Sequence, residues 1–411
     1  MKFFNLMLAA SMAAMVFSSC SKEEGGADIS DKSLKSVTIS LANVKAQAAA
    51  QTMGTRSALE EEIKDETQVK LTNFQVFFSD GTNLYLGKAA DGSPMSHFFV
   101  GKNMNTATSK SFHFLPASVN KVIVIGNVRN AEGAVISSGE TSITVTEGTS
   151  TEENTLKTVL NLQIDKQQNA EELTLYGDCT TLLPRQGDHN SGDNAHANPV
   201  YEAEVNIAPL VARIEVKNIK CTEFGSYAEF KLEKFAFNNY YKSIEANTKT
   251  LSEIVRTKIT PENVFNYFNT LEKTEEDTTP WHWEEFSNAV LAKSDKTEVT
   301  DNPFYYHFFV DGKEFTGDKI NGNETEGYPQ LLLKLTGYSG ANQSGTETPL
   351  YLATTTLNSK GTPIKQFEAG KIYQVSFSFS EDNISQPDKC IEVTVKVATW
   401  TIVLDVTVSF E

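Results

Sequence analysis

Residues 391–410, IEVTVKVATWTIVLDVTVSF, contain the clearest strand pattern in this chain. In the first half the apolar residues occupy odd positions: Ile391, Val393, Val395 and Val397. In the second half they occupy even positions: Trp400, Ile402, Leu404, Val406, Val408 and Phe410. Because side chains alternate between the faces of a strand, each half predicts a strand with one buried face. The change of parity predicts that the chain bends, bulges or changes partners around Ala398–Trp400.

A last strand this apolar is costly to leave in water. Each large apolar side chain gains roughly 1.5–3 kcal/mol on burial. The strand is therefore expected to pair either with a sheet of its own molecule or with a groove on another molecule. An ordinary final strand of a sandwich explains the pattern equally well, so both interpretations stay open at this point.

The rest of the chain predicts an all-β fold of two tandem β-sandwiches with a boundary near residue 205. Val37, Ile39 and Leu41 alternate with polar residues and form the first predicted strand. Residues 122–128, VIVIGNV, predict a central strand buried on both faces. Further strands are predicted at 74–78, 111–115, 143–145, 160–164, 173–176, 202–207, 210–216, 228–237, 304–310, 330–335, 350–354 and 372–379. A short helix in the second domain is predicted from Thr260 as its cap and Pro261 at its first position.

The amino-terminal residues are typical of a secreted lipoprotein. Lys2 precedes an uncharged apolar run, Phe3–Phe17, which is too short to cross a bilayer core of about 30 Å and is typical of a signal peptide. Two serines and then Cys20 follow, an order that resembles a lipobox, in which the cysteine thiol is acylated, for example with palmitate. Residues 21–24, SKEE, resemble a signal for export to the outer face of the outer membrane.

Length, net charge and cysteine count exclude several classes of partner and scaffold. The chain has 411 residues, enough for two or three domains, and a formal net charge of -17. That charge argues against nucleic acid as a partner, because phosphate binding needs a positive field. After Cys20, three widely spaced cysteines remain, Cys179, Cys221 and Cys390, which excludes a disulfide-stapled scaffold and a zinc ribbon. We expect all three to be incidental buried or half-buried residues.

Several features together resemble the fimbrillin family, the shaft subunits of type V pili in Gram-negative anaerobes of the gut and mouth. The matching features are Cys20 in its lipobox, Arg56 after a first strand, the strand 122–127, the strand 210–216, the stretch 370–375 and the strand 391–395 followed by Trp400. Their order covers nearly the whole chain. The resemblance implies transthyretin-like, Greek-key sandwiches and a structural subunit of a fimbrium.

The resemblance also implies how such a subunit polymerises. An arginine-specific protease would cleave between Arg56 and Ser57, a small and polar stretch where nicking is easy. The released propeptide would carry the first strand, with Val37, Ile39 and Leu41. The tail of a neighbouring copy would fill the vacated groove by donor-strand exchange. The positions assigned to the donor strand are the ten apolar ones at 391–410 given above.

The corresponding division is a signal peptide (1–19), a lipidated propeptide (20–56), an N-terminal domain (57–205), a C-terminal domain (206–389) and a donor tail (390–411). The implied partners are further copies of this chain, accessory, anchor and tip pilus subunits, the protease, and the outer membrane through the lipid. The implied location is the outer membrane and then the cell-surface fimbrium. A tip or an anchor subunit is an alternative to a shaft subunit.

No pattern predicts an enzyme, a cofactor or a metal. The chain has no Gly-x-Ser-x-Gly elbow, no Walker motif and no dinucleotide fingerprint. His189, Asp193 and His196 lie in a stretch of Gly, Asn and Asp, which is more typical of a solvated loop than of a metal site. Trp281 and Trp283 leave one alternative from another class, a surface glycan-binding lipoprotein of a polysaccharide-uptake system, in which the two rings form a platform.

Overall fold

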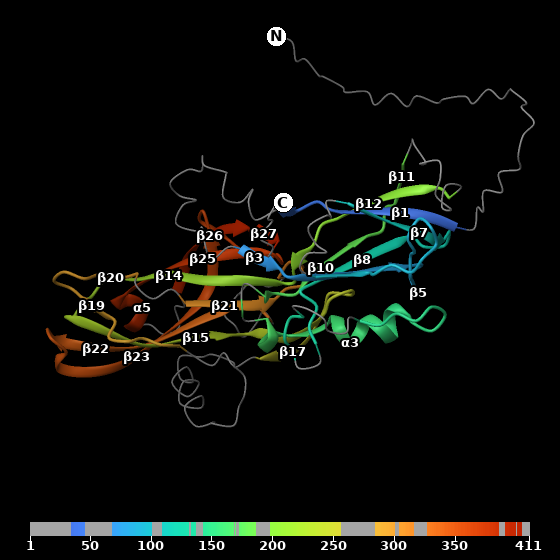
Figure 1. The fold of residues 1–411 in the computed structure, drawn as a ribbon. Helices are drawn as coiled ribbons and strands as arrows, with labels where there is room; N and C mark the ends of the chain where they lie inside the picture. The colour runs from blue at the N-terminus through green and yellow to red at the C-terminus, as the bar shows by residue number, and fades with distance from the viewer. Residues whose placement is uncertain are drawn as a thin grey trace, which may run out of the picture.

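The computed structural model shows two lobes side by side along the long axis of the molecule (Figure 1). It describes residues 34–45, 68–100, 109–130, 133–136, 143–167, 169, 172–185, 198–255, 284–300, 304–315, 327–385, 391–399 and 401–404. Nearly all regular structure within these ranges is β-strand, so the predicted all-β class is confirmed. The helix predicted from Thr260 lies outside the described residues.

The N-terminal lobe is built from two sheets. The four-stranded sheet has the order β11-β12-β1-β7, and its strands are β1 (Leu34–Leu41), β7 (Lys110–Pro116), β11 (Leu183–Pro184) and β12 (Val200–Val205). The six-stranded sheet has the order β13-β10-β8-β4-β5, with β6 also paired to β4. Its strands are β4 (Asn73–Ser79), β5 (Leu84–Tyr85), β6 (Phe98–Val100), β8 (Lys121–Gly126), β10 (Leu175–Cys179) and β13 (Ala208–Pro209).

The two sheets pack face to face through aromatic side chains. Phe112 of β7 lies edge-on to Phe78 of β4, with 5.0 Å between the ring centroids, and it also contacts Phe99 of β6 at 6.4 Å. The predicted central strand is β8, which lies between β10 and β4. Val122, Ile123, Val124 and Ile125 are all fully buried. A run of β-branched residues can occupy such a strand because both of its faces are covered.

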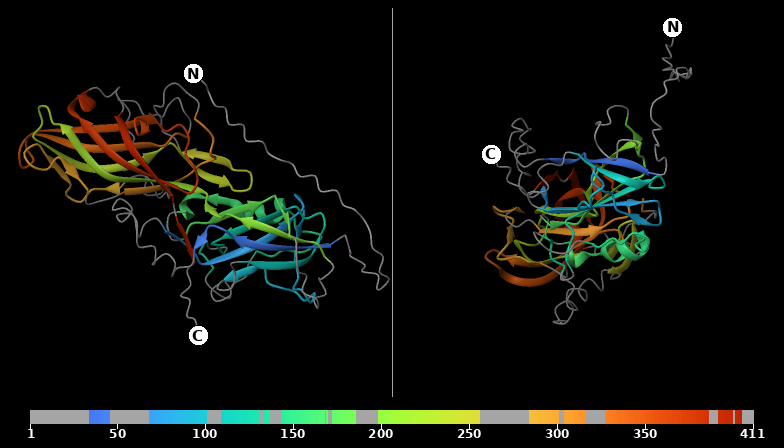
Figure 2. Two further views of the ribbon diagram at one scale, coloured as in Figure 1. Left: turned by 90° about the horizontal axis from the view of Figure 1, so that it is seen from above. Right: turned by 45° about the vertical axis from the view of Figure 1, so that its right-hand side comes forward.

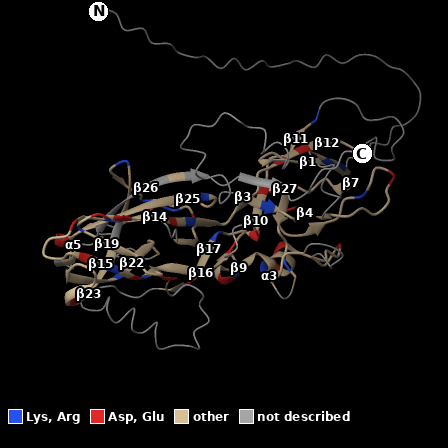
Figure 3. Ribbon diagram, turned by 60° about the vertical axis from the view of Figure 1, so that its left-hand side comes forward, with Lys and Arg blue, Asp and Glu red and all other residues tan. Residues whose placement is uncertain are grey.

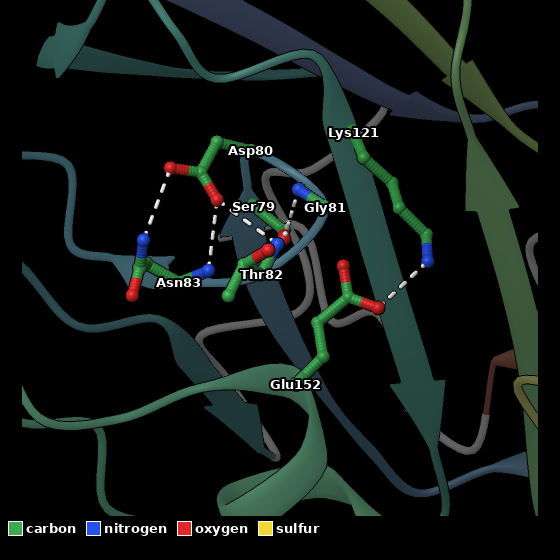
Figure 4. Close-up of polar contacts among 7 residues, drawn as sticks. All are labelled: Ser79, Asp80, Gly81, Thr82, Asn83, Lys121 and Glu152. Carbon is green, nitrogen blue, oxygen red and sulfur yellow. Dashed lines mark hydrogen bonds and ion pairs between the residues drawn. The ribbon is translucent and has the colours of Figure 1, made fainter.

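A tight turn follows β4 (Figure 4). The Asp80 carboxylate accepts hydrogen bonds from the backbone N–H of Thr82 (2.9 Å) and of Asn83 (2.8 Å). Tyr85 donates its hydroxyl to the same carboxylate at 2.6 Å, and these bonds hold the pKa of Asp80 well below its usual range. Gly81 has a φ of 97°, which a residue without a Cβ adopts at no steric cost.

Helical turns cover one side of the N-terminal lobe. They are η2 (Glu152–Leu156), α3 (Lys157–Leu160) and η3 (Ile164–Lys166). The Lys121 ammonium of β8 pairs with Glu152 of η2 at 2.9 Å (Figure 4). The strand predicted at 143–145 is wrong, since these residues form no strand. The Gln75 side chain bonds the N–H (3.0 Å) and the carbonyl (2.6 Å) of Ile143, which satisfies its backbone without a neighbouring strand.

The C-terminal lobe is one continuous sheet of eleven strands folded over itself. Its order is β18-β15-β22-β23-β26-β25-β14-β20, with β19 on β15, β21 on β14 and β24 on β23. The strands are β14 (Val211–Glu223), β15 (Glu229–Asn238), β18 (Glu284–Glu285), β19 (Val290–Ala292), β20 (Glu298–Val299), β21 (Phe304–Phe309), β22 (Gln330–Gly340), β23 (Ser344–Ser359), β24 (Thr362–Pro363), β25 (Lys371–Ser380) and β26 (Ile391–Thr399). The short helix α5 (Glu381–Ser385) follows β25.

The sheet is continuous because β23 is long enough to serve both of its halves. The first part of β23 pairs with β22, and residues from Thr354 onward pair with β26. Strands that pass from one layer to the other in this way form the corners of a sandwich. The two layers meet in an aromatic core, where Phe235 of β15 lies 5.8 Å from Phe377 of β25 between ring centroids.

Two small sheets join the lobes. In the first, β16 (Tyr240–Glu245) pairs with β17 (Thr250–Val255) and with β9 (Asn161–Gln163), which precedes the C-terminal lobe in the chain. In the second, β27 (Thr401–Leu404) lies between β2 (Val44–Lys45) and β3 (Gln68–Leu71). Figure 2 shows the last strand, in red, reaching from the C-terminal lobe to the blue strands of the N-terminal lobe. Charged residues of both signs are spread over both lobes (Figure 3).

Candidate functional site

The first strand, β1, lies inside its sheet and not at an edge. It pairs in parallel with β12, from Ser36 opposite Val200 to Leu41 opposite Val205. It pairs antiparallel with β7, from Leu34 opposite Pro116 to Ile39 opposite Lys110. The predicted strand at Val37–Leu41 is thus confirmed. We call the place that β1 occupies between β7 and β12 the β1 site.

The two faces of β1 differ in polarity as its alternation predicts. Val37 is fully buried and Ile39 is 5% exposed, and both belong to the core of the N-terminal lobe. On the other face the Ser36 hydroxyl lies 2.8 Å from Nδ1 of His113, and the Thr38 hydroxyl lies 2.8 Å from that of Ser111. β1 is therefore bound to β7 by side-chain hydrogen bonds as well as by backbone pairing.

The apolar face of β1 does not fill the core beneath it completely. A small pocket lies under the end of the strand, lined by Ile39, Leu41, Phe74, Val76, Phe99, Lys110 and Phe112. Leu41, the last residue of β1, stays partly exposed. The pocket is walled by aromatic rings and aliphatic side chains, and the Lys110 ammonium lies 4.8 Å from the centroid of the Phe99 ring. Apart from Lys110, all of its lining residues are apolar.

A tight turn after β1 leads the chain toward the junction of the lobes. The N–H of Ala42 donates to the carbonyl of Val205 at 3.2 Å. The Asn43 side chain donates to the carbonyl of Ile207 at 2.5 Å and accepts from the N–H of Ile207 at 3.1 Å. This two-point contact fixes the direction in which the chain continues into β2.

The carboxy-terminal strands confirm the predicted change of partners. β26 pairs with β25 antiparallel and with β23 in parallel, whereas β27 pairs with β2 and β3 in another sheet. The structure places residues of the predicted donor tail in two different strands. Ile391, Val393, Val395 and Val397 lie in β26, which has a partner on each side within its own lobe. Ile402 and Leu404 lie in β27.

Several predicted site residues lie outside the described part of the chain. They are Cys20, Arg56, Ser57, Trp400, Val406, Val408 and Phe410. The tryptophans at 281 and 283 and the histidines at 189 and 196 lie outside it as well. Of the three later cysteines, Cys221 is buried and Cys179 is half-buried, and both are free thiols. Burial raises the pKa of the Cys221 thiol to about 12.

A buried polar cluster in β14 and β21 touches the N-terminal lobe. Arg213 is 2% exposed, lies 3.8 Å from Glu215 and stacks over the Tyr305 ring at 4.1 Å. His307 is fully buried, and its Nδ1 lies 2.8 Å from the carbonyl of Gln167. Burial, helped by the charge of Arg213, lowers the pKa of His307 to about 3, so the ring is neutral at physiological pH. A buried, neutral ring of this kind is typical of a structural histidine.

No pattern in the sequence predicts the contacts at the junction of the lobes. β2 is only two residues long, so no periodicity marks it. Asn43 is an ordinary turn residue by type, and its contact with Ile207 spans 164 positions. The described residues contain no helix able to span a membrane. They also contain no group of three His, Cys, Asp or Glu side chains placed to hold a metal ion.

Comparison with known proteins finds similarity in structure only. No known protein family and no curated protein sequence matches this chain. A protein assigned to cell adhesion in Bacteroides eggerthii is 15% identical, with a TM-score of 0.46, over 91% of this chain and 98% of that one. A similarly assigned protein of Parabacteroides distasonis is 12% identical, with a TM-score of 0.48, over 90% and 98%. A fimbrilin of Porphyromonas gingivalis is 12% identical, with a TM-score of 0.44, over 90% and 99%. Each of these three comparisons covers nearly the whole of both chains.

Proposed function

We propose that this protein is the shaft subunit of a cell-surface fimbrium and that it polymerises by donor-strand exchange. A lipid-anchored precursor, acylated at Cys20, reaches the outer membrane with β1 in place. An arginine-specific protease then cleaves between Arg56 and Ser57. The fragment that carries β1 leaves, and the carboxy-terminal tail of a second copy enters the β1 site.

The observation that supports this proposal is the position of β1. The strand precedes Arg56 in the chain, whereas both of its neighbours, β7 and β12, follow it. Cleavage therefore assigns an interior strand to the released fragment and leaves both neighbours on the subunit. Two rows of unpaired backbone groups and an uncovered apolar core would remain, and such edges pair readily with an added strand.

The tail of another copy offers more apolar surface than β1. β1 presents three alternating apolar residues, Val37, Ile39 and Leu41. The tail presents five at even positions, namely Ile402, Leu404, Val406, Val408 and Phe410. Each additional large apolar side chain contributes roughly 1.5–3 kcal/mol when buried, so burial of the three residues beyond β27, Val406, Val408 and Phe410, would favour the exchange. Repeated head to tail, it gives an open-ended filament whose ends are available to anchor and tip subunits.

The test is to treat the purified precursor with an arginine-specific protease and to look for filaments by electron microscopy. We expect filaments from the wild-type precursor, none from Arg56→Ala, which is not cut at this site, and none after deletion of residues 400–411. Cleaved protein with an intact tail that stays monomeric at high concentration would refute the proposal. A synthetic peptide with the sequence of residues 400–411 should also bind the cleaved subunit and cap growth.

A further inference from the structure

The junction sheet places the carboxy-terminal strand between two segments that the proposed cleavage separates. β27 pairs in parallel with β2 on one side, with Val44 opposite Ile402 and Lys45 opposite Val403. On the other side it pairs in parallel with β3, from Thr401 opposite Gln68 to Leu404 opposite Leu71. Arg56 lies between β2 and β3 in the sequence. One neighbour of β27 therefore belongs to the propeptide and the other to the retained subunit.

We propose that the propeptide also holds the carboxy-terminal strand of its own molecule, so that a single cleavage event opens the β1 site and frees one edge of the donor. This inference rests on the proposed strand exchange. In the precursor β27 is an interior strand. Once β2 leaves, β27 becomes an edge strand, held by β3 alone, and is easier to withdraw and donate.

The turn between β1 and β2 couples these two effects. Only Ala42 and Asn43 separate the strands, and Asn43 is fixed at two points to the backbone of Ile207. β1 in its site therefore sets the position of β2 beside β27. Conversely, the fragment that carries β1 and β2 can leave only when this turn gives up its contacts with Val205 and Ile207.

Hydrogen exchange tests the hold on β27 in the uncleaved precursor, where no filament is needed. Replacing Val44 and Lys45 together by proline removes both backbone N–H groups of β2. The loss of one or two hydrogen bonds should raise the exchange of the amides at 401–404 by about tenfold. The matched control is Thr38→Ala, which removes a contact of β1 with β7 and leaves β2 intact. Equal exchange at 401–404 in all three proteins would overturn the inference.

A disulfide across the pair tests its role in assembly. In a protein with Cys179→Ser and Cys390→Ser, the pair Val44→Cys and Ile402→Cys places cysteines directly opposite each other on neighbouring strands, within reach of a disulfide. We expect the bond to form in the precursor, and cleaved protein to remain monomeric until a reductant is added. The control pair, Thr38→Cys with Ile402→Cys, should not cross-link.

The outcomes separate this inference from the strand-exchange proposal. Filaments that appear only after reduction support both the hold of the propeptide on β27 and the strand-exchange proposal. A bond that forms in protein which stays monomeric even after reduction supports the hold on β27 and counts against strand exchange. No bond, or bonded and cleaved protein that assembles as fast as the wild type, overturns the inference and leaves strand exchange standing.

Discussion

Replacement of Ile39 by alanine should weaken the precursor without affecting the filament. Ile39 is 5% exposed, lies in the middle of the apolar face of β1 and lines the pocket beneath it. An isoleucine-to-alanine change in a core costs about 2–5 kcal/mol. The lower end applies here, because the site already borders a small pocket and its neighbours can relax into it. We therefore expect a loss of about 2 kcal/mol in the unfolding free energy of the precursor.

The same figure predicts a kinetic effect. A loss of about 2 kcal/mol in the hold on β1 corresponds to an increase of roughly 30-fold in the release of the cleaved propeptide. The assay follows precursor stability by denaturant unfolding and propeptide release by size-exclusion chromatography after treatment with the arginine-specific protease. Filaments made from the variant should melt as wild-type filaments do, since residue 39 is no longer in them.

A matched control is Ser40→Ala, on the polar face of the same strand and half-buried. It should leave precursor stability within about 0.5 kcal/mol of wild type. The reasoning is refuted if Ile39→Ala and Ser40→Ala release the propeptide at the same rate. It is also refuted if the Ile39→Ala filaments are themselves less stable, because residue 39 would then still be part of the assembled subunit.

Three further predictions concern the two lobes. The pKa of His307 is about 3 in the folded protein and near 6.5 when unfolded, so the unfolded state binds the extra proton and stability falls as the pH drops from 6.5 toward 3, by up to about 1.4 kcal/mol per pH unit. Unfolding measured against pH should lose this slope in His307→Phe, and an unchanged slope would contradict the assignment. Gly177→Ala should cost about 1–3 kcal/mol, because the new Cβ would lie 2.3 Å from the backbone carbonyl oxygen of Asn206; equal melting temperatures for this variant and the wild type would contradict this packing. Cys221, with its pKa raised to about 12, should resist a thiol reagent at pH 8 until denaturant is added, and labelling at equal rates in the native and unfolded protein would show that the thiol is not buried.

Strand identity was predictable where the burial of side chains follows a simple period. β1 and β26 alternate, β8 is continuously apolar, and each lies where its pattern predicts. Ile143 shows the limit of this reasoning. A short apolar alternation indicates a buried face, but it does not show that a neighbouring strand is present. Here the Gln75 side chain, and not a neighbouring strand, makes hydrogen bonds with the backbone of Ile143.

Pairing was not predictable in the same way, because a partner in a sheet can come from anywhere in the chain. The alternation of Ile391–Val397 is the same for a free tail and for an interior strand, and only the positions of β23 and β25 decide between them. The two-residue strand β2 carries no pattern at all, although it determines the surroundings of β27. The length of β23 likewise gave no sign that one strand would serve both layers of its lobe.

The two neighbours of β1 run in opposite directions, one parallel and the other antiparallel to it. A strand inserted between them therefore has one parallel and one antiparallel neighbour, whichever direction it runs. Backbone hydrogen bonding consequently does not select the direction of the inserted strand. The orientation of each link in a growing fibre must come instead from side-chain fit, above all at the hollow under Leu41, and from where the incoming chain is tethered.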